Sequence, residues 1–125
     1  MKKTVYEERY PDGQLKMCVN YKDGKEDGPR EWYFPNGQLQ FRSNYKNGKL
    51  HGLWEVWNEN GQLIERANYK TGKLDGLAEV WNENGNGQLI ERSNYKFGKL
   101  DGLYEAWDEN GQLIEIVNYK DGQVD

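Results

Sequence analysis

Six glutamates recur at corresponding places along the chain, and paired carboxylates can serve as acid–base catalysts. They are Glu55, Glu65, Glu79, Glu91, Glu105 and Glu115. Acid–base catalysis needs two carboxylates in different environments that push their pKa values apart. A carboxylate that recurs in every unit of a chain is more typical of cross-strand pairing with arginine. The pattern therefore favours a structural role, and no catalytic residue is predicted.

Metal and nucleophile chemistry find little support in the sequence. The chain has one histidine, His51, and one cysteine, Cys18, which excludes a zinc site and a Cys–His nucleophile pair. Loops rich in Asp, Asn and Gly suggest calcium, but the EF-hand spacing is missing and turn formation explains these residues. His51 stands in a turn where other repeats carry an acidic residue, so it is expected to be exposed. No metal, no cofactor and no enzymatic activity are predicted.

Aromatic side chains are the one feature that points to a ligand. Large rings give a thin sheet its buried surface, and this structural role is the simpler interpretation. Exposed rings also dominate contact energies at protein interfaces. On that second interpretation, the predicted partner-binding residues are Trp32, Trp54, Tyr104 and Phe41.

These residues belong to a repeated unit. The tripeptide Asn-Tyr-Lys begins at positions 20, 44, 68, 94 and 118, with spacings of 24, 24, 26 and 24 residues. A fixed period in this range indicates a repeat architecture. We expect one domain, residues 1–125, made of a half-unit 1–19, repeats 20–43, 44–67, 68–93 and 94–117, and a partial unit 118–125.

Each unit is predicted to be a β-hairpin. Runs of six to nine residues rich in Trp, Tyr, Val and Ile lie between turns that contain Gly, and none has helical periodicity. The fold class is therefore all-β, an elongated single-layer antiparallel meander of tandem hairpins with roughly ten strands. Residues 22–28 are expected to be a connecting loop. The extra two residues within Asn84-Gly85-Asn86-Gly87 should lie at a hairpin tip, where they leave the flanking strands in register.

The hairpin register can be tested on charge. A two-residue type I′ turn at Asn60-Gly61 places Glu55 opposite Arg66, whereas a three-residue loop with a bulge places Glu55 opposite Glu65. Unlike charges opposite one another are favourable and like charges are not. The two-residue turn is therefore predicted. The equivalent residues Tyr33, Trp57, Trp81 and Trp107 are expected to form a structural spine along one face, ring upon ring.

Composition narrows the function classes. Only 35% of residues are hydrophobic and 30% are charged, which argues against a thick two-layer core, while 14% aromatic residues argue against disorder. A net charge of −4 and a pI of about 5.1 argue against nucleic acid as a partner. No signal peptide or transmembrane helix is recognised in the sequence, so a cytoplasmic location is expected.

The repeat resembles the bacterial variant of the MORN repeat, whose pattern is Tyr-x-x-Gly-Lys-x-x-Gly-x-Trp-x-x-Tyr-x-x-Asn-Gly-x-Leu. The match recurs with substitutions at Tyr21–Leu39, Tyr69–Leu89 and Tyr95–Leu113, and Trp57 stands where the pattern usually has Tyr. The resemblance implies an elongated twisted sheet of hairpins without catalytic residues. In the second full repeat the matching residues are Tyr45, Gly48, Lys49, Gly52, Trp54, Trp57, Asn60, Gly61 and Leu63.

Members of this family include the YwqK-like group, classed as antitoxins, and eukaryotic interaction scaffolds with proposed lipid contacts. We therefore predict a non-enzymatic, protein-binding repeat module of antitoxin-like or scaffold type, with a toxin as one kind of partner. The alternative is a cell-envelope module that binds glycan or lipid through the same aromatic residues. An unprotected edge strand also suggests a homodimer, formed through the edge or a face of the sheet.

Overall fold

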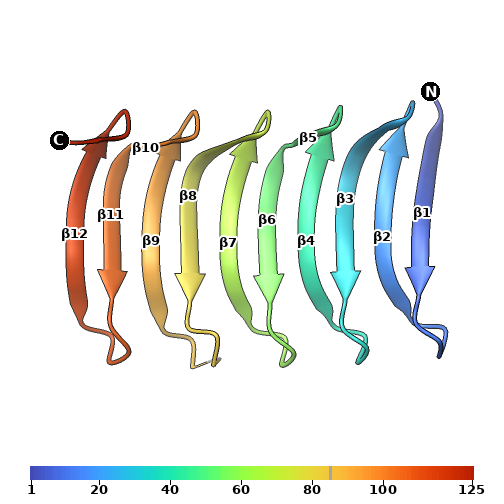
Figure 1. Cartoon of the computed structure of the whole chain (residues 1–125), viewed down its shortest axis with the longest axis horizontal. Helices are drawn as coiled ribbons and strands as arrows, with labels where there is room; N and C mark the ends of the chain where they lie inside the picture. The colour runs from blue at the N-terminus through green and yellow to red at the C-terminus, as the bar shows by residue number, and fades with distance from the viewer. Residues whose placement is uncertain (85) are drawn as a thin grey trace.

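The chain folds into a single open antiparallel sheet, which confirms the all-β meander. The structure, a computed structural model, describes residues 1–84 and 86–125, and these contain 13 strands and no helix. Neighbouring strands follow one another in sequence order, so the two termini lie at opposite ends of the sheet (Figure 1). Contacts between strands are made almost wholly with sequence neighbours, as in other repeat proteins.

Strand bounds follow the repeat. The strands are β1 Lys3–Arg9, β2 Leu15–Lys22, β3 Lys25–Tyr33, β4 Leu39–Lys46, β5 Lys49–Leu50, β6 Gly52–Trp57, β7 Leu63–Lys70, β8 Lys73–Trp81, β9 Leu89–Lys96, β10 Lys99–Leu100, β11 Gly102–Trp107, β12 Leu113–Lys120 and β13 Gln123–Val124.

The roughly ten strands expected correspond to the long runs of the sheet. Strands β5 and β6 are two parts of one run interrupted at His51, and β10 and β11 are interrupted in the same way at Asp101. Both short pieces pair with the strand that precedes them, β5 with β4 and β10 with β9. In β3 and β8 the corresponding run is continuous.

One long edge of the sheet is formed by tight two-residue turns. Asn47 and Gly48 both have positive φ, 51° and 82°, and Lys46 pairs with Lys49 across them. This is the type I′ geometry that fits the twist of a hairpin. The prediction of a connecting loop at residues 22–28 is wrong, because the same turn occurs at Asp23-Gly24 and β3 begins at Lys25. We call this side the lysine edge, after the lysines Lys22, Lys25, Lys46, Lys49, Lys70, Lys73, Lys96, Lys99 and Lys120 that flank its turns.

The opposite long edge has wider turns, and here the predicted turn type is wrong although the predicted register is right. The amide of Gly61 donates to the Asn58 carbonyl at 3.0 Å, and only Gly61 of the loop has positive φ, so the loop has three residues. Such a loop alone would place Glu55 opposite Glu65. Ile64 is an extra, unpaired residue just beyond the loop, and this β-bulge restores Glu55 opposite Arg66.

A second irregularity explains the asparagine that starts three of the repeats, at Asn20, Asn44 and Asn94. Gly52 has a φ of 108° and follows the interruption at His51, and the Leu53 carbonyl is left without a strand partner on that side. The Asn44 side chain fills the gap, because its Nδ2 donates to the Leu53 carbonyl at 3.1 Å. A Cβ on Gly52 would lie 3.5 Å from the Asn44 Cβ, so glycine also allows this close approach.

The two-residue insertion lies at a hairpin tip, as expected for the described part of Asn84-Gly85-Asn86-Gly87. Gly85 lies outside the described residues. Asn82 N donates to the Gln88 carbonyl across the tip at 2.8 Å, and Glu79 still pairs with Arg92. The insertion therefore leaves the register of β8 and β9 equal to that of the other hairpins.

A single-layer sheet has two solvent-facing sides, and the pairing register assigns each side chain to one of them. The ladder face is the side that carries Glu31, Arg42, Glu55, Arg66, Glu79, Arg92 and Glu105. The aromatic face is the other side, which carries Trp32, Phe41, Trp54 and Tyr104. The most buried apolar residues, Met17, Val19 and Ala67, lie on the aromatic face.

Candidate binding surface

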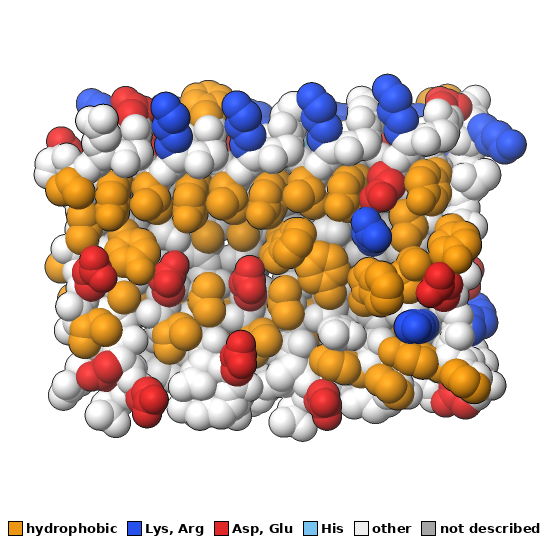
Figure 2. Space-filling model, viewed as in Figure 1, with side chains coloured by type: hydrophobic (Ala, Val, Ile, Leu, Met, Phe, Trp, Pro, Cys, Tyr) orange, Lys and Arg blue, Asp and Glu red, His pale blue; other side chains and the backbone are white. Residues whose placement is uncertain are grey.

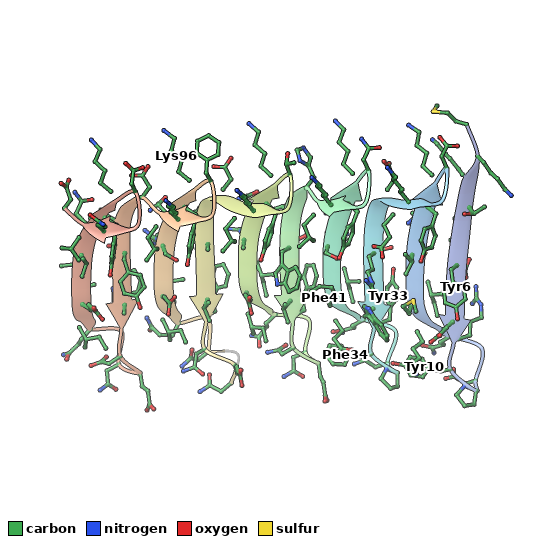
Figure 3. All side chains as sticks on the ribbon, turned by 45° about the horizontal axis from the view of Figure 1, so that its top comes forward. Tyr6, Tyr10, Tyr33, Phe34, Phe41 and Lys96 are labelled. Carbon is green, nitrogen blue, oxygen red and sulfur yellow. The ribbon has the colours of Figure 1, made fainter. Side chains whose placement is uncertain are left out.

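Three of the four predicted binding residues form a cluster on the aromatic face. Trp32 on β3 pairs directly with Phe41 on β4. The Phe41 and Trp54 rings meet edge to face with centroids 4.6 Å apart, and Trp54 also contacts Tyr69 at 5.8 Å. All four side chains are half-buried, so the cluster packs on itself and still presents ring surface to solvent. Figure 3 shows Phe41 on the part of the sheet away from the lysine edge, where Lys96 is labelled.

Tyr104, the fourth predicted residue, lies on the same face but at a distance along the sheet. It is on β11, and its nearest ring neighbour is Tyr119 at 6.4 Å. Strands β7, β8 and β9 separate it from Trp54. At the equivalent positions these strands carry the small residues Ala67, Ala78 and Ser93.

The small residues leave a hollow between the aromatic cluster and Tyr104. The hollow has a volume of about 170 Å³. Ala67 and Ser93 in its floor are 6% and 3% exposed. Its lining also includes Glu65, Glu91, Tyr69 and Tyr95.

A band of hydrophobic side chains borders the aromatic face next to the lysine edge. Figure 2 shows this band crossing the strands, with separate acidic side chains below it. Cross-strand pairs build the band, each between a tyrosine and an aliphatic residue of the following strand: Tyr45 with Leu50, Tyr69 with Leu74, Tyr95 with Leu100 and Tyr119 with Val124.

The electrostatics of the aromatic face are acidic. Burial raises the pKa of Tyr69 above its usual value of 10.0, and the Glu65 carboxylate raises it further. Burial likewise raises the pKa of Tyr104, with added contributions from Glu91 and Glu115. Both phenols therefore stay protonated, and able to donate a hydrogen bond, throughout the physiological pH range.

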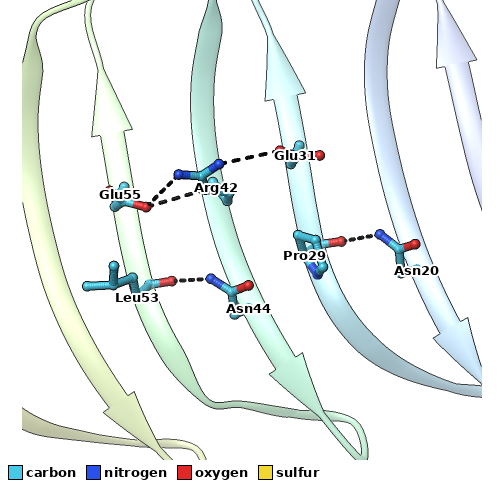
Figure 4. Close-up of polar contacts among 7 residues, drawn as sticks. All are labelled: Asn20, Pro29, Glu31, Arg42, Asn44, Leu53 and Glu55. Carbon is cyan, nitrogen blue, oxygen red and sulfur yellow. Dashed lines mark hydrogen bonds and ion pairs between the residues drawn. The ribbon is translucent and has the colours of Figure 1, made fainter.

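The ladder face satisfies its own charges. Arg42 Nη2 lies 3.2 Å from Glu55 and its Nη1 lies 3.8 Å from Glu31, so one arginine joins two hairpins (Figure 4). Figure 4 also shows the Asn20–Pro29 and Asn44–Leu53 bonds that recur beside the ladder. The ladder continues through Arg66 with Glu79 and through Arg92 with Glu79 and Glu105.

The predicted spine residues lie on the ladder face, but guanidinium groups cover the tryptophans. Arg42 lies over Trp57, Arg66 over Trp81 and Arg92 over Trp107, each at 5.6 Å from the ring centroid. The ring contacts within the described residues do not include a pair from this file. The sequence held the signal for this arrangement, because an arginine stands fifteen residues before each of these tryptophans: Arg42 before Trp57, Arg66 before Trp81 and Arg92 before Trp107.

Tyr33, the remaining member of the file, is held differently. The Tyr10 hydroxyl donates to the Tyr33 backbone carbonyl at 2.6 Å. Burial raises the Tyr33 pKa, and Glu31 beside it adds to the effect. Figure 3 shows Tyr10 and Phe34 near the edge of wider turns, close to the N-terminal end of the sheet.

His51 and Cys18, the residues considered for metal binding or nucleophilic chemistry, have structural roles or low reactivity. The expectation that His51 is exposed is wrong: His51 is half-buried, and its Nδ1 accepts a hydrogen bond from the Thr71 amide at 3.3 Å. Asp27 accepts from the Asn47 amide in the same way, so this position links one repeat to the turn of the next. Burial raises the Cys18 pKa, which keeps the thiol protonated and weakly nucleophilic.

No group of three or more potential metal ligands is found among residues 1–84 and 86–125. In the same described residues, no helix is long and apolar enough to cross a membrane.

A family model, described as the MORN repeat variant, matches four segments of the chain: residues 4–23, 26–47, 50–71 and 100–121. The chain belongs to the MORN repeat variant family. Each matched segment of this MORN repeat variant protein ends at the first residue of a type I′ turn of the lysine edge: Asp23, Asn47, Thr71 and Asp121. The unmatched stretch 72–99 contains the two-residue insertion. A search of curated proteins found no match.

Proposed function

We propose that this MORN repeat variant chain is a non-enzymatic protein-binding module, with an antitoxin-like or scaffold role in the bacterial cytoplasm, whose aromatic face receives the partner. The observation that carries this proposal is the half-exposed cluster of Trp32, Phe41 and Trp54 on a sheet face that no second layer of the described chain covers. Aromatic anchors of this kind dominate the energy of protein interfaces.

The contrast between the two faces supports the same assignment. On the ladder face the arginines and glutamates of neighbouring hairpins pair with one another, which favours an internal, stabilising role. On the aromatic face one position differs in size and chemistry from repeat to repeat: it is occupied by Arg30, Trp54, Ala78 and Tyr104. Variation at one position of a regular scaffold gives an irregular surface, which suits recognition of a specific partner.

Affinity capture from the source cells tests the proposal with two matched variants. Ala78→Tyr fills the hollow of the aromatic face, and the fold accommodates it because Tyr104 and Trp54 occupy the same position in other repeats. Leu77→Tyr places the same ring on the adjacent residue of the ladder face, where Leu77 is 37% exposed.

The proposal predicts a protein retained in stoichiometric amount by the wild type and by Leu77→Tyr, and lost with Ala78→Tyr. Identification of that protein by mass spectrometry then separates a neutralised toxin from a scaffold partner. Loss of the partner with Leu77→Tyr alone would place binding on the ladder face and contradict the proposal. If no protein is retained by the wild type, the same rings would be tested against glycans and liposomes.

A further inference from the structure

Three glutamates of the aromatic face lack the arginine partners that their counterparts on the ladder face possess. Glu65 lies between Val56 and Val80 across the strands, and Glu91 lies between Val80 and Ala106. Glu115 pairs with Ala106. The ion pairs among the described residues involve none of the three.

Two of these carboxylates border the hollow. Glu65 and Glu91 line it together with Tyr69 and Tyr95, above a floor that includes Ala78. Arg66 and Glu79 also line the hollow, but they belong to the ladder face and pair with each other at 3.0 Å, so among the described residues of its lining the charged groups without an ion-pair partner are Glu65 and Glu91. A cation is attracted both by carboxylates and by the faces of aromatic rings.

The charge is concentrated in the C-terminal half of the aromatic face. The N-terminal half carries two acidic groups: Glu26 lies 3.5 Å from Arg30, and Glu8 on β1 accepts a hydrogen bond from the Tyr6 hydroxyl at 2.9 Å. Strands β7, β9 and β12 carry Glu65, Glu91 and Glu115 with no basic residue at the intervening aromatic-face positions Ala78, Val80, Tyr104 and Ala106. The cluster therefore combines an unbalanced acidic surface with a shaped hollow.

We propose that the C-terminal half of the aromatic face binds a basic segment of a protein partner, with a lysine or arginine side chain entering the hollow between Glu65 and Glu91. This inference rests on the proposed protein-binding function and names the chemistry of the partner. Charge complementarity carries it: like charges facing one another cost affinity, and opposite charges direct association.

The strand spacing sets the spacing of the basic residues. Neighbouring strands lie about 4.8 Å apart, so Glu65 and Glu91, two strands apart, are separated by about 10 Å across the sheet. A segment that crosses the strands in the polyproline II conformation rises about 3.1 Å per residue. A basic residue at every third position of such a segment meets one carboxylate after another.

Fluorescence anisotropy with designed peptides tests the inference. The probes are one labelled peptide with lysine at every third position and the same peptide with those lysines replaced by glutamate. The first protein variant is Glu65→Gln/Glu91→Gln/Glu115→Gln, which keeps the side-chain shapes. The matched control is Glu59→Gln/Glu83→Gln/Glu109→Gln, because these three exposed glutamates are at the tips of the hairpins and the change in net charge is identical.

At low ionic strength the wild type and the tip variant are expected to bind the lysine peptide with similar affinity, and neither binds the glutamate peptide. The aromatic-face variant is expected to lose about tenfold in affinity. Equal losses in both triple variants, or equal binding of the two peptides, would overturn the inference.

The same variants separate this inference from the proposed function. In one outcome the cellular partner is lost with Ala78→Tyr but kept with Glu65→Gln/Glu91→Gln/Glu115→Gln. That result would support the aromatic face as the binding face and overturn the inference that the partner segment is basic. Loss of the partner with both variants supports the proposed function and the basic partner segment.

Discussion

At the scale of single residues, the turns of the lysine edge contain backbone strain. Five non-glycine residues have φ near 50°, and two of them, Thr71 and Phe97, are poorly suited to it because β-branched and bulky side chains disfavour that region. Phe97 is also 68% exposed, so burial of its ring compensates little of the backbone strain. At the equivalent position of another turn stands Asn47, and asparagine is the residue that this position of a type I′ turn prefers.

We predict that Phe97→Asn raises the free energy of unfolding by about 1 kcal/mol, because it relieves the strained turn. The reciprocal change Asn47→Phe should lower it by a similar amount. Urea denaturation followed by circular dichroism measures both. A loss of stability in Phe97→Asn would show that the Lys96–Phe97 contact, at 6.0 Å, outweighs the strain.

Trp57 tests the proposed spine at the same scale. Its ring is half-buried and lies under the Arg42 guanidinium. Trp57→Ala should lower the free energy of unfolding by about 2 kcal/mol, which is less than the loss for a fully buried tryptophan. The control is Leu53→Ala, because Leu53 lies four residues earlier on the same face and is 38% exposed; this change should cost under about 1 kcal/mol. Equal losses would refute a special role for the Trp57 file.

At the scale of strands and turns, the two long edges of the sheet differ in their tolerance of change in length. Deletion of Asn84 and Gly85 should change the free energy of unfolding by less than about 0.5 kcal/mol, because Glu79 already pairs with Arg92 in the common register. Deletion of Thr71 and Gly72 removes a type I′ turn and should cause a much larger loss. Thermal unfolding of the two deletion variants compares them, and similar midpoints would contradict the assignment of the edges.

The sequence predicted the hairpins and the Glu–Arg register, since both depend on a pattern that every repeat displays. It did not predict the type of turn, because Asn-Gly fits either a two-residue or a three-residue loop. The choice depends on the bulge at Ile64, which allows the three-residue loop and the favourable charge pairing together. Bulges restore register without a sequence signal as distinct as that of a turn.

The arrangement of the candidate binding residues was harder to predict than the strands. Trp32, Trp54, Phe41 and Tyr104 do share a face, as alternation along the strands requires. The hollow between them arises from three small residues on three strands. Their adjacency, Ala67 opposite Ala78 and Ala78 opposite Ser93, depends on the register of two hairpins.

At the scale of the whole molecule, a single sheet stabilises its fold by ring and ion-pair contacts between neighbouring strands. Burial raises the pKa of Tyr33, Tyr69 and Tyr104, so each holds its proton more tightly in the folded than in the unfolded chain. The stability due to these groups is full below the usual pKa of 10.0 and is lost as the pH rises through the folded-state values.

We therefore predict that the urea midpoint falls between about pH 9 and pH 11 together with tyrosine ionisation, which absorbance near 295 nm records. The double variant Tyr69→Phe/Tyr104→Phe should show a shallower decline. An unchanged decline in this variant would show that these two tyrosines do not cause the loss of stability.

The central claim is that one face of the sheet stabilises the fold and the other binds. The five tryptophans divide between the faces: Trp32 and Trp54 lie on the aromatic face, and Trp57, Trp81 and Trp107 lie on the ladder face. Oxidative footprinting of the chain, alone and bound to its captured partner, reads all five in one measurement. We predict protection of Trp32 and Trp54 with no change at the other three. Protection of Trp57, Trp81 and Trp107 with no change at Trp54 would contradict the claim.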